Sequence, residues 1–78
     1  MPRFFFDTYD GQDFRRDTEG LVLPDRPAIQ SAAMAQLTAL VSSLLPEQGH
    51  CDIITNVKDE EGQQVYTMSV SLAGRWVR

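Results

Sequence analysis

The stretch Asp25–Leu45, DRPAIQSAAMAQLTALVSSLL, decides the fold because it is typical of one long helix between two strand-rich segments. Asp25 is suited to the N-cap position, where its carboxylate accepts from free amides of the first turn. Pro27 falls in that first turn, where a missing N–H costs little. Pro46, with Gly49 just beyond it, predicts the end of the helix.

Placed at 100° per residue, the helix has a wide apolar arc and a narrow polar back. The main apolar stripe consists of Ile29, Ala33, Leu37, Leu40 and Leu44. One flank widens this stripe with Met34, Val41 and Leu45, and the other flank is a strip of small residues, Ala28, Ala32, Ala35 and Ala39.

The helix carries no charged residue between Arg26 and Glu47, so its polar face is weaker than that of an ordinary surface helix. Two interpretations stay open. The helix either lies across one small sheet with the alanines serving as good helix formers, or one of its flanks contacts a second chain.

The segment before the helix predicts a hairpin. Arg3–Tyr9 is the first strand, with Phe4 and Phe6 on one face and Phe5, Asp7 and Tyr9 on the other. Asp10-Gly11 is a hairpin turn signal. The return strand begins at 14–16, is interrupted at 17–20 by a turn or bulge, and is completed by 21–23.

The segment after the helix predicts a second hairpin. Residues 51–58 form the third strand, 59–62 a turn, and 65–72 the fourth strand. The fourth strand alternates, with Tyr66, Met68, Val70 and Leu72 inward. We therefore expect one α+β domain over residues 1–78, with two β-hairpins flanking the helix (ββαββ) and a four-stranded antiparallel sheet covered on one face. The order of the strands and the phenylalanine set that faces the helix stay open.

Composition narrows the class of protein. The 78 residues carry a net charge of −4, which opposes attraction to nucleic acid and to anionic membranes. The single Cys51 cannot form an internal disulfide, and MPRFFFDTYD does not have the pattern of a secretion signal. The helix contains too much Ser, Thr and Gln to span a bilayer. We expect a cytoplasmic protein that does not enter the membrane.

The acidic residues of the first hairpin are candidates for a cation site or for an acid–base pair. These residues are Asp7, Asp10, Asp13, Asp17 and Glu19. The spacing of a calcium loop fails, because Phe6 and Thr8 fall where acids belong when Gly11 takes the sixth position. We expect turn-forming, solvated acids, no metal, no cofactor and no catalytic residues.

Three other residues invite a functional reading. His50 and Cys51 are adjacent, but neighbouring strand residues point to opposite faces, so we expect a loop histidine and a small buried cysteine. Trp76 lies between Arg75 and Arg78, a combination that can anchor to a partner or stack on bases. We expect Trp76 to pack on the edge of the domain with solvated arginines.

The motifs MPRFFFDTYDG and DTEGLVLPD resemble those of a family of small uncharacterised alphaproteobacterial proteins, common in rhizobia, that share a domain of unknown function. The family pattern PR-[FY]-[FY]-F-D-x-x-D-G is similar to residues 2–11, and its V-x-D-x-x-G-x-x-V hairpin is similar to residues 57–65. The likeness covers nearly the whole chain, although the helix here is more apolar than that of the family. It implies a bacterial domain and transfers no catalytic residue.

The sequence does not define an activity. We expect a noncatalytic protein-interaction module, either a homodimer or a binder of another protein, that uses a helix flank or a sheet edge. The candidate interface residues are Ala28, Ala32, Met34, Ala35, Ala39, Val41, Leu45 and Trp76. The alternative is a small-ligand or nucleic-acid binder that uses the open sheet face with Phe5, Tyr9 and the arginines.

Overall fold

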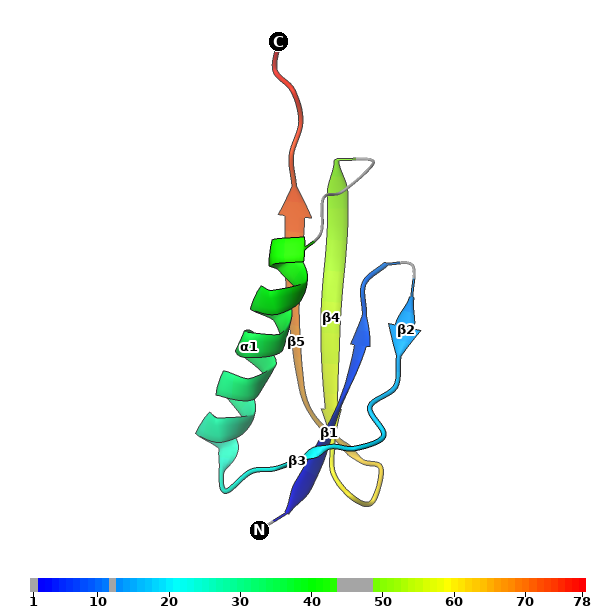
Figure 1. Cartoon of the computed structure of the whole chain (residues 1–78), viewed down its shortest axis with the longest axis vertical. Helices are drawn as coiled ribbons and strands as arrows, with labels where there is room; N and C mark the ends of the chain where they lie inside the picture. The colour runs from blue at the N-terminus through cyan, green and yellow to red at the C-terminus, as the bar shows by residue number, and fades with distance from the viewer. Residues whose placement is uncertain (1, 12, 44–48) are drawn as a thin grey trace.

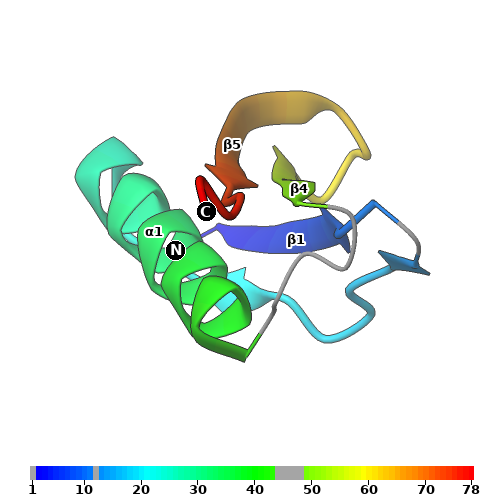
Figure 2. The same ribbon diagram turned by 90° about the horizontal axis from the view of Figure 1, so that it is seen from above.

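A single helix packs on one face of an antiparallel sheet in the computed structural model, which describes residues 2–11, 13–43 and 49–78 (Figure 1). The elements in chain order are β1 (Arg3–Tyr9), β2 (Phe14–Arg15), β3 (Leu21–Val22), α1 (Arg26–Ser43), β4 (His50–Lys58) and β5 (Gln64–Ala73). Seen from above, the helix lies on one side of a strongly twisted sheet (Figure 2). The α+β class is confirmed, and the predicted ββαββ layout is matched only roughly.

The sheet has five strands and not the four that the sequence predicts. Its order is β2-β1-β4-β5, and β3 pairs with the same edge of β1 as β2 does. The difference arises from the return strand, which is split at the predicted interruption. Thr8 and Tyr9 pair with β2, whereas Arg3 and Phe4 pair with β3.

The helix begins where the sequence predicts. The Asp25 carboxylate accepts a hydrogen bond from the backbone N–H of Ala28 at 2.9 Å, as an N-cap does. Ile29, Ala33 and Leu37 of the main stripe are buried, and Leu40 is half-buried. Leu44, Pro46 and the end of the predicted helix lie outside the described residues.

The core lies between the helix and the even-numbered face of β1. Phe6, Ile29, Ala33 and Val57 form a buried cluster. Its half-buried neighbours are Phe4, Leu23, Ala32, Tyr66 and Met68. The set that faces the helix is therefore Phe4 and Phe6, and Phe5 lies on the other face of the sheet.

The second hairpin is longer than predicted at both ends. β4 and β5 pair from His50 with Ala73 to Lys58 with Gln64, with a register shift at Val57/Lys58. His50 is thus the first residue of β4, and the expectation of a loop histidine is wrong. The inward residues of β5 are half-buried while their neighbours are exposed, as the alternation predicts.

Candidate interaction surface

The edge of the sheet formed by β2 and β3 is organised by one side chain. Between the two strands, the Asp17 carboxylate accepts the backbone N–H of Phe6 at 3.0 Å, an amide that neither short strand pairs. Its other oxygen accepts from the N–H groups of Glu19 at 3.1 Å and Gly20 at 3.0 Å. In the turn at 17–20, the Asp17 carboxylate therefore accepts the Phe6 N–H in place of the backbone carbonyl that a continuous strand would supply.

The hydrogen bonds of Asp17 favour its charged form. Burial raises the pKa of the Asp17 carboxyl, but the N–H donors of Gly20, Phe6 and Glu19, together with the charge of Lys58, lower the pKa to a net value below 3.8. Asp17 stays ionised at neutral pH and holds the turn.

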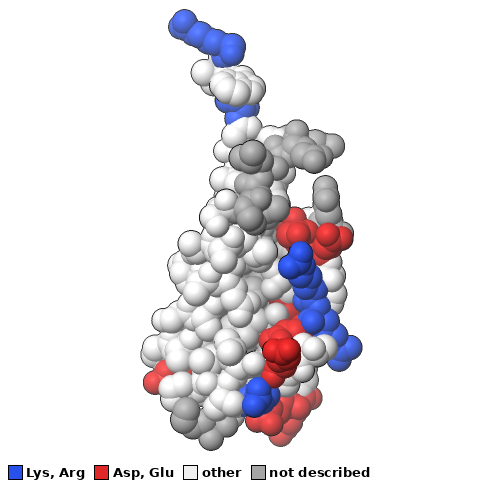
Figure 3. Space-filling model, in the orientation of Figure 1, with Lys and Arg blue, Asp and Glu red and all other residues white. Residues whose placement is uncertain are grey.

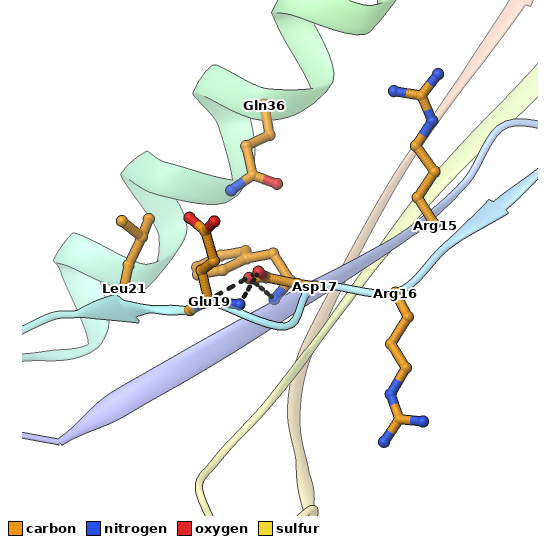
Figure 4. Close-up of a pocket in the computed structure, with 8 residues that line it drawn as sticks. Arg15, Arg16, Asp17, Glu19, Leu21 and Gln36 are labelled. Carbon is orange, nitrogen blue, oxygen red and sulfur yellow. Dashed lines mark hydrogen bonds between the residues drawn. The ribbon is translucent and has the colours of Figure 1, made fainter.

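A shallow hollow of about 340 Å³ lies beside this turn, between the β2/β3 edge and the helix (Figure 4). Its lining residues are Phe6, Arg15, Arg16, Asp17, Glu19, Gly20, Leu21 and Gln36. Arg15 and Arg16 extend in opposite directions, and the Asp17 carboxylate is occupied by backbone amides (Figure 4). The hollow does not gather a convergent set of polar groups around a small molecule.

The face of the sheet away from the helix is polar. The Lys58 Nζ lies 2.9 Å from an Asp7 carboxylate oxygen, and the other Asp7 oxygen accepts the N–H of Asp17. Asn56 Oδ1 accepts from the Thr67 hydroxyl at 2.8 Å and from the Gln64 amide at 3.2 Å. The expectation that the hairpin acids are all solvated is wrong for Asp7, which is 8% exposed and paired because β1 is a central strand.

The remaining hairpin acids serve turns. Asp10 Oδ1 accepts the N–H of Asp13 at 2.8 Å, and Glu19 offers its backbone carbonyl to the Arg3 guanidinium at 2.7 Å. Among the described residues, no group of three or more His, Cys, Asp or Glu side chains gathers in a way that could hold a metal ion.

A cluster that the sequence does not predict joins Ser71, near the end of β5, to Asp52 and His50, at the start of β4. Asp52 Oδ1 accepts from the Ser71 hydroxyl and lies 3.3 Å from His50 Nε2. The carboxylate stands between serine and histidine, so the histidine is not placed to take the serine proton as a catalytic base does. The register of β4 and β5 pairs Asp52 with Ser71, and His50 lies two residues before Asp52 on the same face of β4.

Cys51 takes no part in this cluster. Cys51 is half-buried, so the expectation of a small buried residue holds in part. Its thiol donates to the Asp10 carbonyl oxygen at 3.5 Å. His50 and Cys51 point to opposite faces and form no nucleophile pair.

The structure divides the candidate interface residues among three places. Gln36 lines the hollow beside β2 and β3, so the adjacent small-residue strip lies on that side of the helix, and the opposite flank with Met34 and Val41 lies on the β5 side. Ala28, Ala32 and Val41 are half-buried, whereas Ala35, Ala39 and Met34 are exposed. Leu45 lies outside the described residues.

Trp76 occupies the third place. It is 95% exposed on the segment that follows β5, so the expectation that it packs on the domain edge is wrong. The segment runs on past the end of β5 as an extended tail, away from the body of the molecule (Figure 1). Nothing in the described part of the chain lies close enough to cover the indole.

The two edges of the sheet differ in how they are protected. The β2/β3 edge has two short strands, a break and four charged residues, Arg15, Arg16, Asp17 and Glu19. β5 pairs only with β4 among the described strands, runs for ten residues and contains neither a charged residue nor a proline. Charges, breaks and prolines are the devices that keep an edge strand from pairing with another chain, and β5 has none of them.

Charge follows the same division across the molecule. In Figure 3 the basic and acidic side chains alternate along one side. The surface over the helix in this view carries no charge except near its lower end. The basic side chains on this side lie among acidic ones and do not form a basic stripe (Figure 3). No helix in the described part of the chain is long and apolar enough to cross a membrane.

Comparison with known proteins gives one result. Residues 3–71 match a family model described as a domain of unknown function, DUF6894, which agrees with the resemblance to a family of that kind. No curated protein and no solved structure was found to match the chain.

Proposed function

The chain belongs to the DUF6894 family, whose description assigns no activity, and we propose from its geometry that it is a noncatalytic protein-interaction module. The observation that carries the proposal is the unprotected outer edge of β5. The N–H and C=O groups on that edge can pair with an extended segment of a partner, as in other proteins that bind by strand addition.

Main-chain hydrogen bonds would supply part of the affinity, and side chains on both sides of β5 would supply the rest. On the helix side, Tyr66, Met68 and Val70 are half-buried, and Met34 is 57% exposed on its flank of the helix. A partner strand beside β5 can cover this apolar surface as it pairs with the edge. Exposed apolar surface of this kind marks an interaction site when it is contiguous.

Site-specific photo-crosslinking in the native cell tests the proposal. A photoreactive amino acid replaces Thr67 on β5, and a matched variant carries it at Arg15 on β2, since both positions are exposed strand residues at opposite edges. We expect a discrete protein adduct from position 67 and much less from position 15. Equal labelling from both positions, or none from position 67, contradicts the proposal. Mass spectrometry of the adduct identifies the partner.

The alternative function uses the open sheet face to bind a small ligand or nucleic acid. Tyr9 is 42% exposed there, which favours it, but Phe5 is half-buried and Asp7 and Lys58 neutralise each other at the centre of the face. An oligonucleotide mobility shift at low salt tests this alternative, because phosphate contacts strengthen as salt falls. We do not expect a shift.

We propose that the protein works in a bacterial cytoplasm. The resemblance of its motifs to those of alphaproteobacterial proteins supports the organism, and the single unpaired cysteine suits a reducing compartment.

A further inference from the structure

We infer that the strand which adds to β5 is β5 of a second copy, antiparallel and centred on Ser69, so that two chains form one continuous sheet. The inference rests on the proposed function and names its partner. Three independent features of β5 and its surroundings support a second copy over an unrelated chain.

The first feature is the register. In an antiparallel pair, two facing residues either both point their N–H and C=O groups toward the opposite strand or both point them away from it. Along β5, every second residue points these groups away from β4. Two β5 strands can therefore pair only through residues an even number of positions apart. The same condition keeps side chains of one kind on one face.

Centring the pair on Ser69 satisfies this condition along the whole strand. Tyr66 then faces Leu72 of the second copy, and Met68 faces Val70, all on the helix side. Thr67 faces Ser71 on the open side. Apolar residues meet apolar residues, hydroxyls meet hydroxyls, and no charged side chain falls in the paired region.

The second feature is the charge at the two ends of β5. The turn before it carries Asp59, Glu60 and Glu61, and the tail after it carries Arg75 and Arg78. An antiparallel pair places the arginines of each copy beside the acidic turn of the other. A parallel pair would place acid beside acid, so the charges favour the antiparallel arrangement.

The tail also gains cover in this arrangement. Trp76 and Val77 are 95% and 84% exposed in the single chain. In the register centred on Ser69, Trp76 reaches the level of Gly62 of the second copy. A Cβ built on Gly62 meets no atom within 4 Å, so an indole has room there. The most exposed aromatic residue among those described is thereby given a surface to contact.

The third feature is closure. Because the β2/β3 edge is broken and charged, each chain offers one edge for pairing, and two chains satisfy each other without leaving a free edge of the same kind. The two-fold axis runs perpendicular to the sheet and sets both helices on the same face. The Met34 flanks of the two helices then point toward each other. The assembly ends as a dimer and does not grow into a fibre.

Charge substitutions at Ser69 test both the partner and the register. Ser69 is exposed in the single chain, and facing side chains of a strand pair stand about 4.5–5.5 Å apart at Cβ. Ser69→Lys and Ser69→Asp each place like charges opposite each other, whereas a mixture of the two variants places opposite charges there. Ser31→Lys, on the exposed back of the helix, is the charge-matched control.

Light scattering after size-exclusion chromatography supplies the readout, with circular dichroism to verify that each variant folds. We expect dimers for the wild type and Ser31→Lys, a dimer Kd at least tenfold higher for each Ser69 variant alone, and recovery of the dimer in the equimolar mixture. A wild-type monomer at every concentration overturns the inference. So does a dimer that neither Ser69 variant weakens, or a mixture that recovers nothing.

Cysteine substitution covers the case in which a charged variant fails to fold. In a Cys51→Ser background, Ser69→Cys should form an intermolecular disulfide under a mild chemical oxidant, and Ser31→Cys should not. Absence of the Ser69→Cys disulfide also overturns the inference. A monomeric protein that still crosslinks from position 67 to another protein would leave the proposed function standing and remove only the second copy as its partner.

Discussion

At the scale of single residues, Asp17 shows how one side chain shapes an edge of the sheet. It accepts three backbone N–H groups from Phe6, Glu19 and Gly20, and the first of these would otherwise lack a partner on β1. Its own N–H donates to Asp7, which in turn pairs with Lys58. The turn, the central strand β1 and β4 are thus tied together by side chains of three charged residues.

We predict that Asp17→Asn lowers the free energy of unfolding by about 1–3 kcal/mol at pH 7, because the amide nitrogen cannot accept the N–H of Phe6. Urea unfolding followed by circular dichroism measures the change. Asp13→Asn, which removes an exposed charge from the same hairpin, is the control and should change the free energy by less than about 0.5 kcal/mol. Equal effects from the two variants would contradict the role given to Asp17.

The lowered pKa of Asp17 makes this stabilisation depend on pH. A carboxyl whose folded pKa lies below its unfolded value stabilises the native state fully above that unfolded value, here 3.8. The stabilisation is lost as the pH falls below 3.8 toward the folded pKa. The difference in unfolding free energy between wild type and Asp17→Asn should therefore be constant from pH 7 to about pH 5 and shrink below about pH 4. A difference that grows on acidification would refute it.

Thr55 is a polar residue in the core whose hydroxyl is left without a hydrogen bond among the described residues. It is fully buried in β4. We predict that Thr55→Val raises the free energy of unfolding by about 1 kcal/mol, since the change keeps the shape and removes an unsatisfied group. Thr67→Val is the contrasting variant, because its hydroxyl donates to Asn56. It should be neutral or destabilising in the same urea titration.

At the scale of elements, the broken return strand depends on Gly20. Its φ is +72°, and a Cβ there would lie 2.9 Å from the carbonyl oxygen of Phe4 and 3.0 Å from the ring of Phe5. Gly62 has a similar φ of +84° but open space around it. The two glycines separate the cost of the backbone conformation from the cost of crowding.

We predict that Gly20→Ala lowers the free energy of unfolding by about 2–4 kcal/mol, through the left-handed backbone and the clash with β1 together. Gly62→Ala should lower it by only about 1 kcal/mol, through the backbone alone. Thermal and urea unfolding of both variants measure the difference. If Gly62→Ala proves as harmful as Gly20→Ala, crowding against β1 is not what fixes the turn.

The elements that the sequence predicts well are those with local signals. Asp25 and the Ile29–Ala33–Leu37 spacing predict the start and the buried face of the helix, and alternation predicts the inward set of β5. The break at 17–20 is also visible, because Asp17 and Gly20 are turn formers. These features depend on interactions between residues close together in the chain, so each can be predicted from its own segment of sequence.

The elements that the sequence does not predict depend on contacts between distant segments. Strand order and the facing side of Phe6 follow from the pairing of β1 with β4, which no local pattern specifies. The sequence predicts a solvated Asp7, because its partner Lys58 lies far away in the chain. The contact of Ser71 with Asp52 has the same origin, since β4 and β5 bring these two residues together. The sequence limits the candidate surface to a helix flank or a sheet edge. Choosing the edge of β5 requires the strand order, which the sequence does not give.

At the scale of the whole molecule, the domain is small for the apolar surface that it carries. A chain of this length buries only about 60% of the surface of its unfolded state. The buried apolar residues described are Phe6, Ile29, Ala33, Leu37, Ile53 and Val57, while Phe14, Met34, Val65 and Trp76 are all more than 40% exposed. Pairing of two chains along β5 would bury more surface without lengthening the chain. The free energy of unfolding would then depend on dimer formation.

This coupling leads to the last prediction, that the stability of the wild-type protein depends on its concentration. If the native state is a dimer and the unfolded state is monomeric, each tenfold increase in protein concentration shifts the unfolding equilibrium by about 1.4 kcal/mol toward the native state. The thermal midpoint should therefore rise with concentration wherever the protein concentration exceeds the dimer Kd, in a series from micromolar to millimolar protein. The Ser69→Lys variant, whose dimer is weaker, should need at least tenfold more protein to reach the same rise in midpoint. Its midpoint should also lie below that of the wild type at high concentration and approach it at low concentration, where the wild-type dimer dissociates before unfolding. A wild-type midpoint independent of concentration would mean that the edge of β5 contributes nothing to the stability of the fold, and that the single chain supplies all of it.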